Sequence, residues 1–136
     1  MIHIPPETQL KATIKPGSVF YFVDESLSSD QPHYFILINK KPLTDHKLLL
    51  VCASSQIQKV KIRRKNLSRT TLVEIKQDEY SDFTKDSIID CNIVFDRTIE
   101  QLIHKLSCGE LKLKSYVSEK LLEKIESCRY QQSPGR

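Results

Sequence analysis

The sequence predicts a mainly β protein of the α+β class, in which a small barrel of antiparallel strands is followed by C-terminal helices. Three observations support this fold class. Apolar or alternating runs of strand length recur between residues 18 and 95. Two later stretches, within residues 98–128, carry apolar residues at helical spacing. The strands come first and the helices last, an order typical of a barrel with appended helices.

Two apolar runs, residues 33–39 and 46–53, form the centre of the predicted fold. They are rich in β-branched, leucine and aromatic residues and are joined by a loop that contains turn-forming residues. We expect them to pair as an antiparallel hairpin that is covered on both faces. In such a hairpin the start of one strand lies beside the end of the next. His33 should therefore lie close to Ser54 and Ser55.

Further strands are expected on either side of this hairpin. They are predicted at residues 18–23, 71–76 and 87–95, and alternation of apolar and basic residues suggests a short strand at 60–62. The residues predicted to be largely buried are Ile36, Ile38, Leu49, Val51, Ile89 and Leu102.

Two helices are predicted near the end of the chain, at residues 98–106 and 118–128. Thr98 and Gln101 fit a capping box at the start of the first helix. A single domain is expected over residues 15–128. We expect residues 1–14 to be loosely ordered, because two prolines interrupt them, and residues 129–136 to be a frayed polar tail.

Composition limits the classes of function. The 136-residue chain has a formal net charge of +4, which is compatible with nucleic acid or an acidic partner. No apolar stretch approaches the roughly 20 residues that span a bilayer, and no signal peptide is visible. The expectation is a cytoplasmic protein that does not enter membranes.

The sequence offers no obvious metal or cofactor site. The four cysteines form no Cys-x-x-Cys pair, and we expect them to be reduced, without a disulfide or zinc. His3, His46 and His104 are separated from one another and from carboxylates at ligand spacing. The chain has three glycines and no phosphate-cradling loop. We therefore expect no metal and no cofactor.

The densest basic segment is residues 59–69. In a strand, Lys59, Lys61 and Arg63 would project to one side and, with Arg64, could follow a phosphate backbone. An ordinary solvated face is the alternative. The acidic loop at 78–86 could neutralise this segment or act as a gate, and the sequence leaves that choice open.

The order of these pieces resembles the MazF/PemK family of toxin endoribonucleases. A Pro-Gly turn leads into the strand Ser18-Val-Phe, an apolar strand begins with His33-Tyr-Phe-Ile, and another ends in Ala53-Ser-Ser. The stretch Ser87-Ile-Ile-Asp-Cys-Asn-Ile-Val-Phe, the later Cys108-Gly-Glu-Leu and a final helix complete the similarity, which covers roughly residues 15–128. The order of the pieces carries the resemblance.

The resemblance implies an SH3-like barrel, usually a homodimer, that cleaves single-stranded RNA without metal and is neutralised by an antitoxin. His33 stands where the family usually has arginine, and Ser54 or Ser55 where it often has threonine. Asp90-Cys-Asn stands where some members carry Arg-Cys-Asp. These departures keep a second hypothesis open: a non-catalytic barrel that binds nucleic acid or a protein.

The candidate catalytic residues are His33, Ser54 and Ser55. Histidine can transfer the proton of an RNA 2′-hydroxyl near neutral pH, and a serine hydroxyl can donate to a phosphate oxygen. The candidate RNA-binding residues are Lys59, Lys61, Arg63 and Arg64. Of these, Lys59, Arg63 or Arg64 could also stabilise the developing charge. The alternatives are a surface histidine at a strand end and a pair of turn serines, so the sequence leaves open whether the chain is an enzyme.

Overall fold

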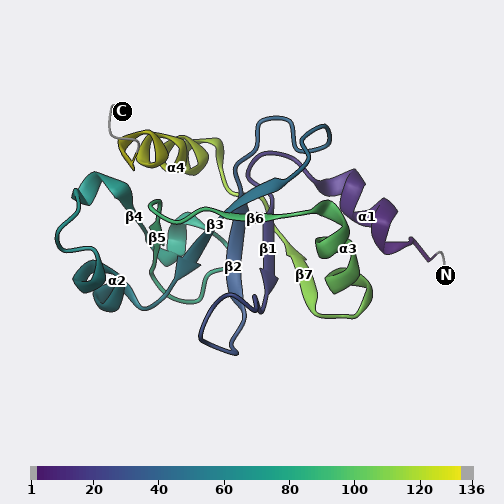
Figure 1. Ribbon diagram of the computed structural model, residues 1–136, viewed down its shortest axis with the longest axis horizontal. Helices are drawn as coiled ribbons and strands as arrows, with labels where there is room; N and C mark the ends of the chain where they lie inside the picture. Colours follow the sequence, from purple (N-terminus) through teal and green to yellow (C-terminus); the bar gives the residue numbers. More distant parts are fainter. Residues whose placement is uncertain (1–2, 133–136) are drawn as a thin grey trace.

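The computed structural model describes residues 3–132 of the 136-residue chain (Figure 1). The described elements, in chain order, are α1 (Pro6–Thr13), β1 (Val19–Phe22), β2 (His33–Leu37), β3 (Leu48–Ser54), α2 (Ile57–Arg63), the 3₁₀ turn η1 (Arg69–Thr71), β4 (Leu72–Ile75), the 3₁₀ turn η2 (Gln77–Glu79), β5 (Ser87–Asp90), β6 (Phe95–Arg97), α3 (Ile99–Ser107), β7 (Leu111–Lys114) and α4 (Glu119–Gln132).

The strands form one antiparallel sheet in the order β4-β5-β3-β2-β1-β7, and β6 also pairs with β3. The seven-residue strand β3 holds the sheet together because its end pairs with β5 while its beginning pairs with β6. The predicted mainly β, α+β class with antiparallel strands is confirmed. The narrower prediction of an SH3-like barrel stays a prediction.

The central hairpin is confirmed. Strands β2 and β3 are antiparallel, with Tyr34 opposite Ala53 and Leu37 opposite Leu50. One residue further along this register, His33 comes beside Ser54. Figure 1 shows the hairpin in the middle of the molecule, with α2 near one end and α1 and α3 near the other.

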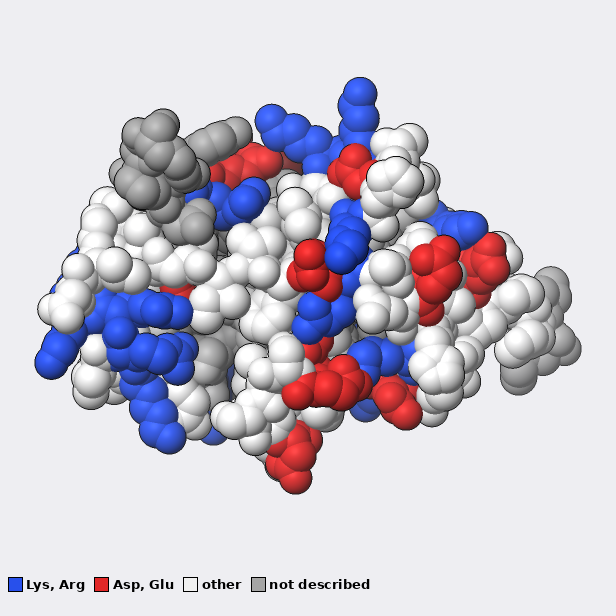
Figure 2. All heavy atoms as spheres, viewed as in Figure 1, with Lys and Arg blue, Asp and Glu red and all other residues white. Residues whose placement is uncertain are grey.

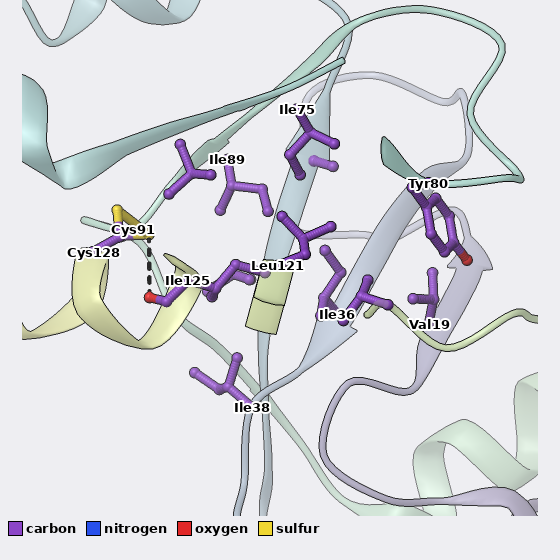
Figure 3. Packing of buried hydrophobic residues seen from close by; sticks show 14 of the residues in the cluster. Val19, Ile36, Ile38, Ile75, Tyr80, Ile89, Cys91, Leu121, Ile125 and Cys128 are labelled. Carbon is purple, nitrogen blue, oxygen red and sulfur yellow. Dashed lines mark hydrogen bonds between the residues drawn. A yellow bond between two sulfur atoms is a disulfide. The ribbon is translucent and has the colours of Figure 1, made fainter. Parts of the chain in front are cut away.

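Both faces of the sheet are covered, as the nearly continuous apolar runs predicted. On one face, Ile36, Val51 and Ile89 pack with Leu121 and Ile125 of α4, and Figure 3 shows most of these side chains. On the other face, the alternate residues of the strands form a second cluster. This cluster includes Phe20, Phe35, Leu37, Leu50, Leu10 of α1 and Leu102 of α3.

Five of the six residues predicted to be buried are buried: Ile36, Ile38, Val51, Ile89 and Leu102. The prediction is wrong for Leu49, which is half-buried and packs at the margin of the first cluster. Its neighbour Leu50, which points to the opposite face, is fully buried instead.

The predicted long strand at 87–95 is interrupted after Asp90. The Oδ1 atom of Asp90 accepts hydrogen bonds from the backbone and side-chain nitrogens of Asn92, at 3.0 and 2.8 Å. Such a side-chain turn competes with the ladder of a strand. The chain therefore forms two strands, β5 and β6, which both pair with β3.

The N-terminal segment is better ordered than the sequence suggested. The expectation of loose order is wrong for residues 6–13, which form α1. Pro6 begins the helix, where proline is tolerated because the first helical N–H groups have no partner inside the helix. Leu10 is completely buried against the second cluster and fastens α1 to the sheet.

The two late helices are found where the sequence predicted them. The capping box of α3 is confirmed: Thr98 Oγ1 accepts from the Gln101 amide at 3.1 Å, and Gln101 Oε1 accepts from the Thr98 amide at 2.8 Å. Helix α4 continues to Gln132, so the expected frayed tail is wrong for residues 129–132. The rest of that tail, residues 133–136, lies outside the described part of the chain.

The expectation that all four cysteines are reduced is also wrong. Cys91, just after β5, forms a disulfide with Cys128 on α4, and their Cα atoms are 6.0 Å apart (Figure 3). Both residues are buried where α4 covers the sheet. They are 37 residues apart and form no short motif, so the sequence alone gave no sign that they would meet.

Candidate active-site groove

A groove of about 800 Å³ lies where β2 begins and β3 ends. The loop after β1, helix α2 and the loop before β5 also line it. The three candidate catalytic residues line this groove together with two of the four candidate RNA-binding residues. The five are His33, Ser54, Ser55, Lys59 and Arg63.

His33 and Ser54 occupy the same face of the sheet, because side chains alternate along a strand and the two residues are adjacent in the β2–β3 register. Nδ1 of His33 lies 3.0 Å from the carbonyl oxygen of Gln31. A carbonyl can only accept, so Nδ1 carries the proton in this contact. In the neutral ring Nε2 is then left as the hydrogen-bond acceptor.

The two serines combine a turn with a place in the groove. Ser54 Oγ accepts a hydrogen bond from the backbone amide of Gln56 at 3.0 Å, which shapes the turn into α2. A hydroxyl that accepts one bond still has its own hydrogen to donate. Ser55 follows in the turn and is exposed. The turn interpretation is therefore correct for Ser54, and it leaves the hydroxyl able to contact a ligand.

The first part of the basic segment, residues 59–63, belongs to helix α2, so the predicted strand at 60–62 is wrong. The alternation of Val60 and Ile62 suggested a strand, but Val60 is buried while Ile62 is 66% exposed. Lys59 and Arg63 are four residues apart and therefore share one side of the helix. Both line the groove.

The other two basic residues face the sheet. Lys61 Nζ lies 2.8 Å from Glu74 on β4, and Arg64 Nε lies 2.6 Å from Oδ2 of Asp90 on β5. Both side chains are about three-quarters covered. These ion pairs fasten α2 to the sheet edge, whereas Lys59 and Arg63 are exposed toward the groove.

The acidic loop does not bring its carboxylates to the groove. Asp82 accepts from the backbone amide of Ser115 at 2.9 Å, and hydrogen bonding to Ser115 holds the pKa of Asp82 below its usual range. Asp86 accepts from the amide of Gln77 at 2.9 Å. The loop instead contributes Phe83, Thr84 and Lys85 to the lining.

Sequence reasoning missed Lys85. Its signal was weak because it is a single lysine inside a mainly acidic loop, and its position depends on how that loop is folded. With Lys85, the groove has lysine or arginine on two different segments, α2 and the loop before β5. Figure 2 shows blue Lys and Arg side chains gathered over the end of the molecule that carries α2.

Cys52 also lines the groove but is not suited to nucleophilic chemistry. Burial, with a smaller effect of Asp24, raises the pKa of the Cys52 thiol to about 12. The thiol is therefore protonated at neutral pH, and only a thiolate is an effective nucleophile.

Within residues 3–132, no cluster of His, Cys, Asp and Glu side chains is suited to hold a metal ion. In the same part of the chain, none of the helices combines the length and the apolar composition needed to cross a membrane.

No protein-family model and no curated protein matches the sequence. Solved structures do match the fold. An endoribonuclease from a Mycobacterial species, in complex with its cognate antitoxin, aligns with a TM-score of 0.58 at 10% identity, covering 88% of this chain and 94% of that one. A second Mycobacterial endoribonuclease aligns with a TM-score of 0.54 at 11% identity, covering 88% and 89%. The chain thus shares its fold with these two endoribonucleases.

Proposed function

We propose that this protein is a toxin-type endoribonuclease, divergent from but similar to the MazF/PemK family, which cleaves single-stranded RNA without a metal ion. The observation that carries the proposal is the arrangement of His33 and Ser54. They lie side by side on one face of neighbouring strands, in a groove that also contains Lys59 and Arg63. The fold shared with two endoribonucleases supports it.

In the proposed reaction, Nε2 of His33 accepts the proton of a ribose 2′-hydroxyl. The 2′-oxygen then attacks the adjacent phosphorus, and the bond from phosphorus to the 5′-oxygen of the next nucleotide breaks. The leaving oxygen takes a proton from water, and the hydroxide that remains takes up the proton held on Nε2 of His33, which restores the neutral ring. The products are a 2′,3′-cyclic phosphate and a free 5′-hydroxyl.

The other groove residues would stabilise the charge that builds up on the phosphate oxygens. Ser54, or Ser55 beside it, would donate a hydrogen bond from its hydroxyl. Lys59 and Arg63 would contribute positive charge from α2. Lys61 and Arg64, which pair with the sheet, would act indirectly by holding that helix in position.

The proposal includes a partner that restrains the activity. One of the two endoribonucleases described above was solved with its cognate antitoxin, and we propose an antitoxin for this chain as well. A homodimer with SH3-like barrels is part of the same proposal, because the resembling family has these properties. Action in the cytoplasm is also part of it, because no signal peptide is visible in the sequence.

A second candidate is a non-catalytic module that binds nucleic acid or a protein through the same groove. One observation favours it: among the described residues that line the groove, His33 is the single imidazole, and it stands where the resembling family usually has arginine. A groove with cations but an ineffective acid–base group would bind RNA without cutting it.

The test is incubation of the purified chain with single-stranded RNA in the presence of EDTA. The proposal predicts fragments that end in a 2′,3′-cyclic phosphate, with double-stranded RNA and single-stranded DNA left intact. Binding without cleavage would favour the second candidate. Cleavage that stops in EDTA would contradict the metal-independent mechanism.

A further inference from the structure

We propose that the groove has a second phosphate-binding subsite, centred on Lys85, which holds a backbone phosphate next to the one that is cleaved. This inference rests on the proposed function, because it assigns a further contact to the same RNA strand. The groove lies at the ends of β2 and β3 and is lined by residues from both faces of the sheet.

The two faces contribute different residues. His33 and Ser54 belong to the face that carries Phe35 and Cys52. Tyr34 belongs to the opposite face, where its ring lies 5.0 Å from that of Phe83, in the loop that also carries Lys85. The groove is therefore lined by the proposed catalytic pair from one face of the sheet and by Lys85 from the loop that packs against the other face.

The backbone around Lys85 is fixed on both sides. Before it, the carbonyl oxygen of Asp82 accepts from the Tyr34 hydroxyl at 2.9 Å, and Phe83 is 7% exposed. After it, Asp86 binds the Gln77 amide, and Ser87 Oγ donates to the carbonyl oxygen of Lys85 at 3.2 Å. A lysine on a fixed backbone loses less conformational freedom when it binds an anion.

Lys85 is also available for a ligand. Among the ion pairs between described residues, none involves its ammonium group, and the nearest acidic side chain in sequence, Asp86, lies 3.7 Å from Nζ of Lys76. The side chain is exposed and lines the groove beside Thr84, whose hydroxyl can donate a further hydrogen bond.

The chemistry of the ligand follows from this arrangement. A single-stranded nucleic acid presents one phosphate per nucleotide, so a strand that lies across the groove can place successive phosphates near successive cations. The volume of about 800 Å³ is within the range of sites that enclose ligands much larger than one phosphate. Lys59 and Arg63 serve the phosphate at His33, and Lys85 serves the neighbouring phosphate.

The experiment measures binding of a short single-stranded oligonucleotide in which every 2′-hydroxyl is methylated, so that it cannot be cleaved. Dissociation constants are determined over a series of salt concentrations for the wild type, Lys85→Gln, Lys85→Arg and Lys40→Gln. Lys40 is exposed in the loop at the opposite end of the hairpin, so its variant is a matched control for the loss of one charge.

Each phosphate contact on a single strand contributes about 0.7 to the slope of log affinity against log salt. We expect Lys85→Gln to reduce the slope by about 0.7 and to weaken binding about twofold to fivefold at low salt. Lys85→Arg and Lys40→Gln should keep the wild-type slope. An unchanged slope in Lys85→Gln, with normal wild-type binding, would overturn the subsite alone. A wild type that binds no oligonucleotide would overturn the proposed function together with it.

Discussion

Arg64 Nε lies 2.6 Å from Oδ2 of Asp90, whereas the adjacent Arg63 is exposed toward the groove. Two neighbouring arginines at the C-terminal end of α2 therefore have different roles: Arg64, which caps the helix, holds α2 on strand β5, and Arg63, the last helical residue, is exposed to contact a ligand. Asp90 is itself fixed by two hydrogen bonds from Asn92, so the contact with Arg64 joins the helix to a rigid turn.

This division predicts losses of stability of very different size for two otherwise similar substitutions. Arg64→Gln should lower the free energy of unfolding by about 1–3 kcal/mol, because it leaves the largely buried Asp90 carboxylate without its charged partner. Arg63→Gln should change it by less than about 0.5 kcal/mol, as expected for an exposed residue. Urea unfolding measures both. Equal losses of stability would mean that Arg64 does not hold the helix.

The core offers a second matched pair. Leu50→Ala should cost about 2–5 kcal/mol, because it removes a fully buried side chain and leaves a cavity. Leu49→Ala should cost clearly less, since Leu49 is half-buried on the opposite face. Urea unfolding of the two variants gives the comparison. A larger loss for Leu49→Ala would show that the two faces of β3 are assigned the wrong way round.

These residues also show what could be predicted from the sequence. The β2–β3 hairpin was predictable because nearly every position is apolar, and this pattern is typical of a strand between two packed layers. The partial burial of Leu49 was not predictable, because a run of apolar residues without alternation does not indicate which side chains are buried most deeply. The same hairpin geometry was sufficient to bring His33 beside Ser54.

Residues 60–62, which lie in helix α2, were predicted to be a strand because apolar and basic residues happen to alternate there. A strand interpretation requires Val60 and Ile62 to be buried together, but the short helix buries Val60 and exposes Ile62. Strand β7, with the pattern Leu-Lys-Leu-Lys, had real alternation that was overlooked. Lys85 and the Cys91–Cys128 disulfide depend on contacts between distant segments, which local patterns do not reveal.

A buried ion pair holds the loop that follows β1, and this pair predicts that the free energy of unfolding depends on pH. Arg97 donates to both carboxylate oxygens of Asp24, at 2.9 and 2.7 Å, and Asp24 is 1% exposed. Burial by itself raises the pKa of Asp24, but the hydrogen bonds from Arg97 and Ser26 outweigh it and hold the pKa below its usual range.

A carboxyl group whose pKa is lowered by folding stabilises the protein above its unfolded pKa of about 3.9 and loses that contribution as the pH falls through the folded value. We therefore expect Asp24→Asn to cost about 2–3 kcal/mol at pH 7. The difference from the wild type should shrink below about pH 4. Urea unfolding at several pH values measures this difference in the free energy of unfolding. A difference that stays constant down to pH 2 would contradict the role of this ion pair.

The disulfide predicts how many cysteine thiols react before and after reduction. The unfolded protein should react with a thiol reagent at two cysteines, Cys52 and Cys108, before reduction and at all four after reduction. Opening the disulfide should lower the free energy of unfolding by about 2–4 kcal/mol, because the unfolded chain is then less constrained. Four reactive thiols in protein purified without reductant would show that the bond does not form.

The central claim is that His33 performs the proton transfer in the groove. The most direct measurement is the rate of cleavage of single-stranded RNA in EDTA, with enzyme in excess, by the wild type, His33→Ala and His46→Ala. His46 is exposed in the loop at the other end of the hairpin and serves as the control. The account predicts that His33→Ala lowers the rate by about 10²–10⁴, the usual contribution of a positioned acid–base group, while His46→Ala cleaves like the wild type. Equal rates for the wild type and a folded His33→Ala variant would contradict the account.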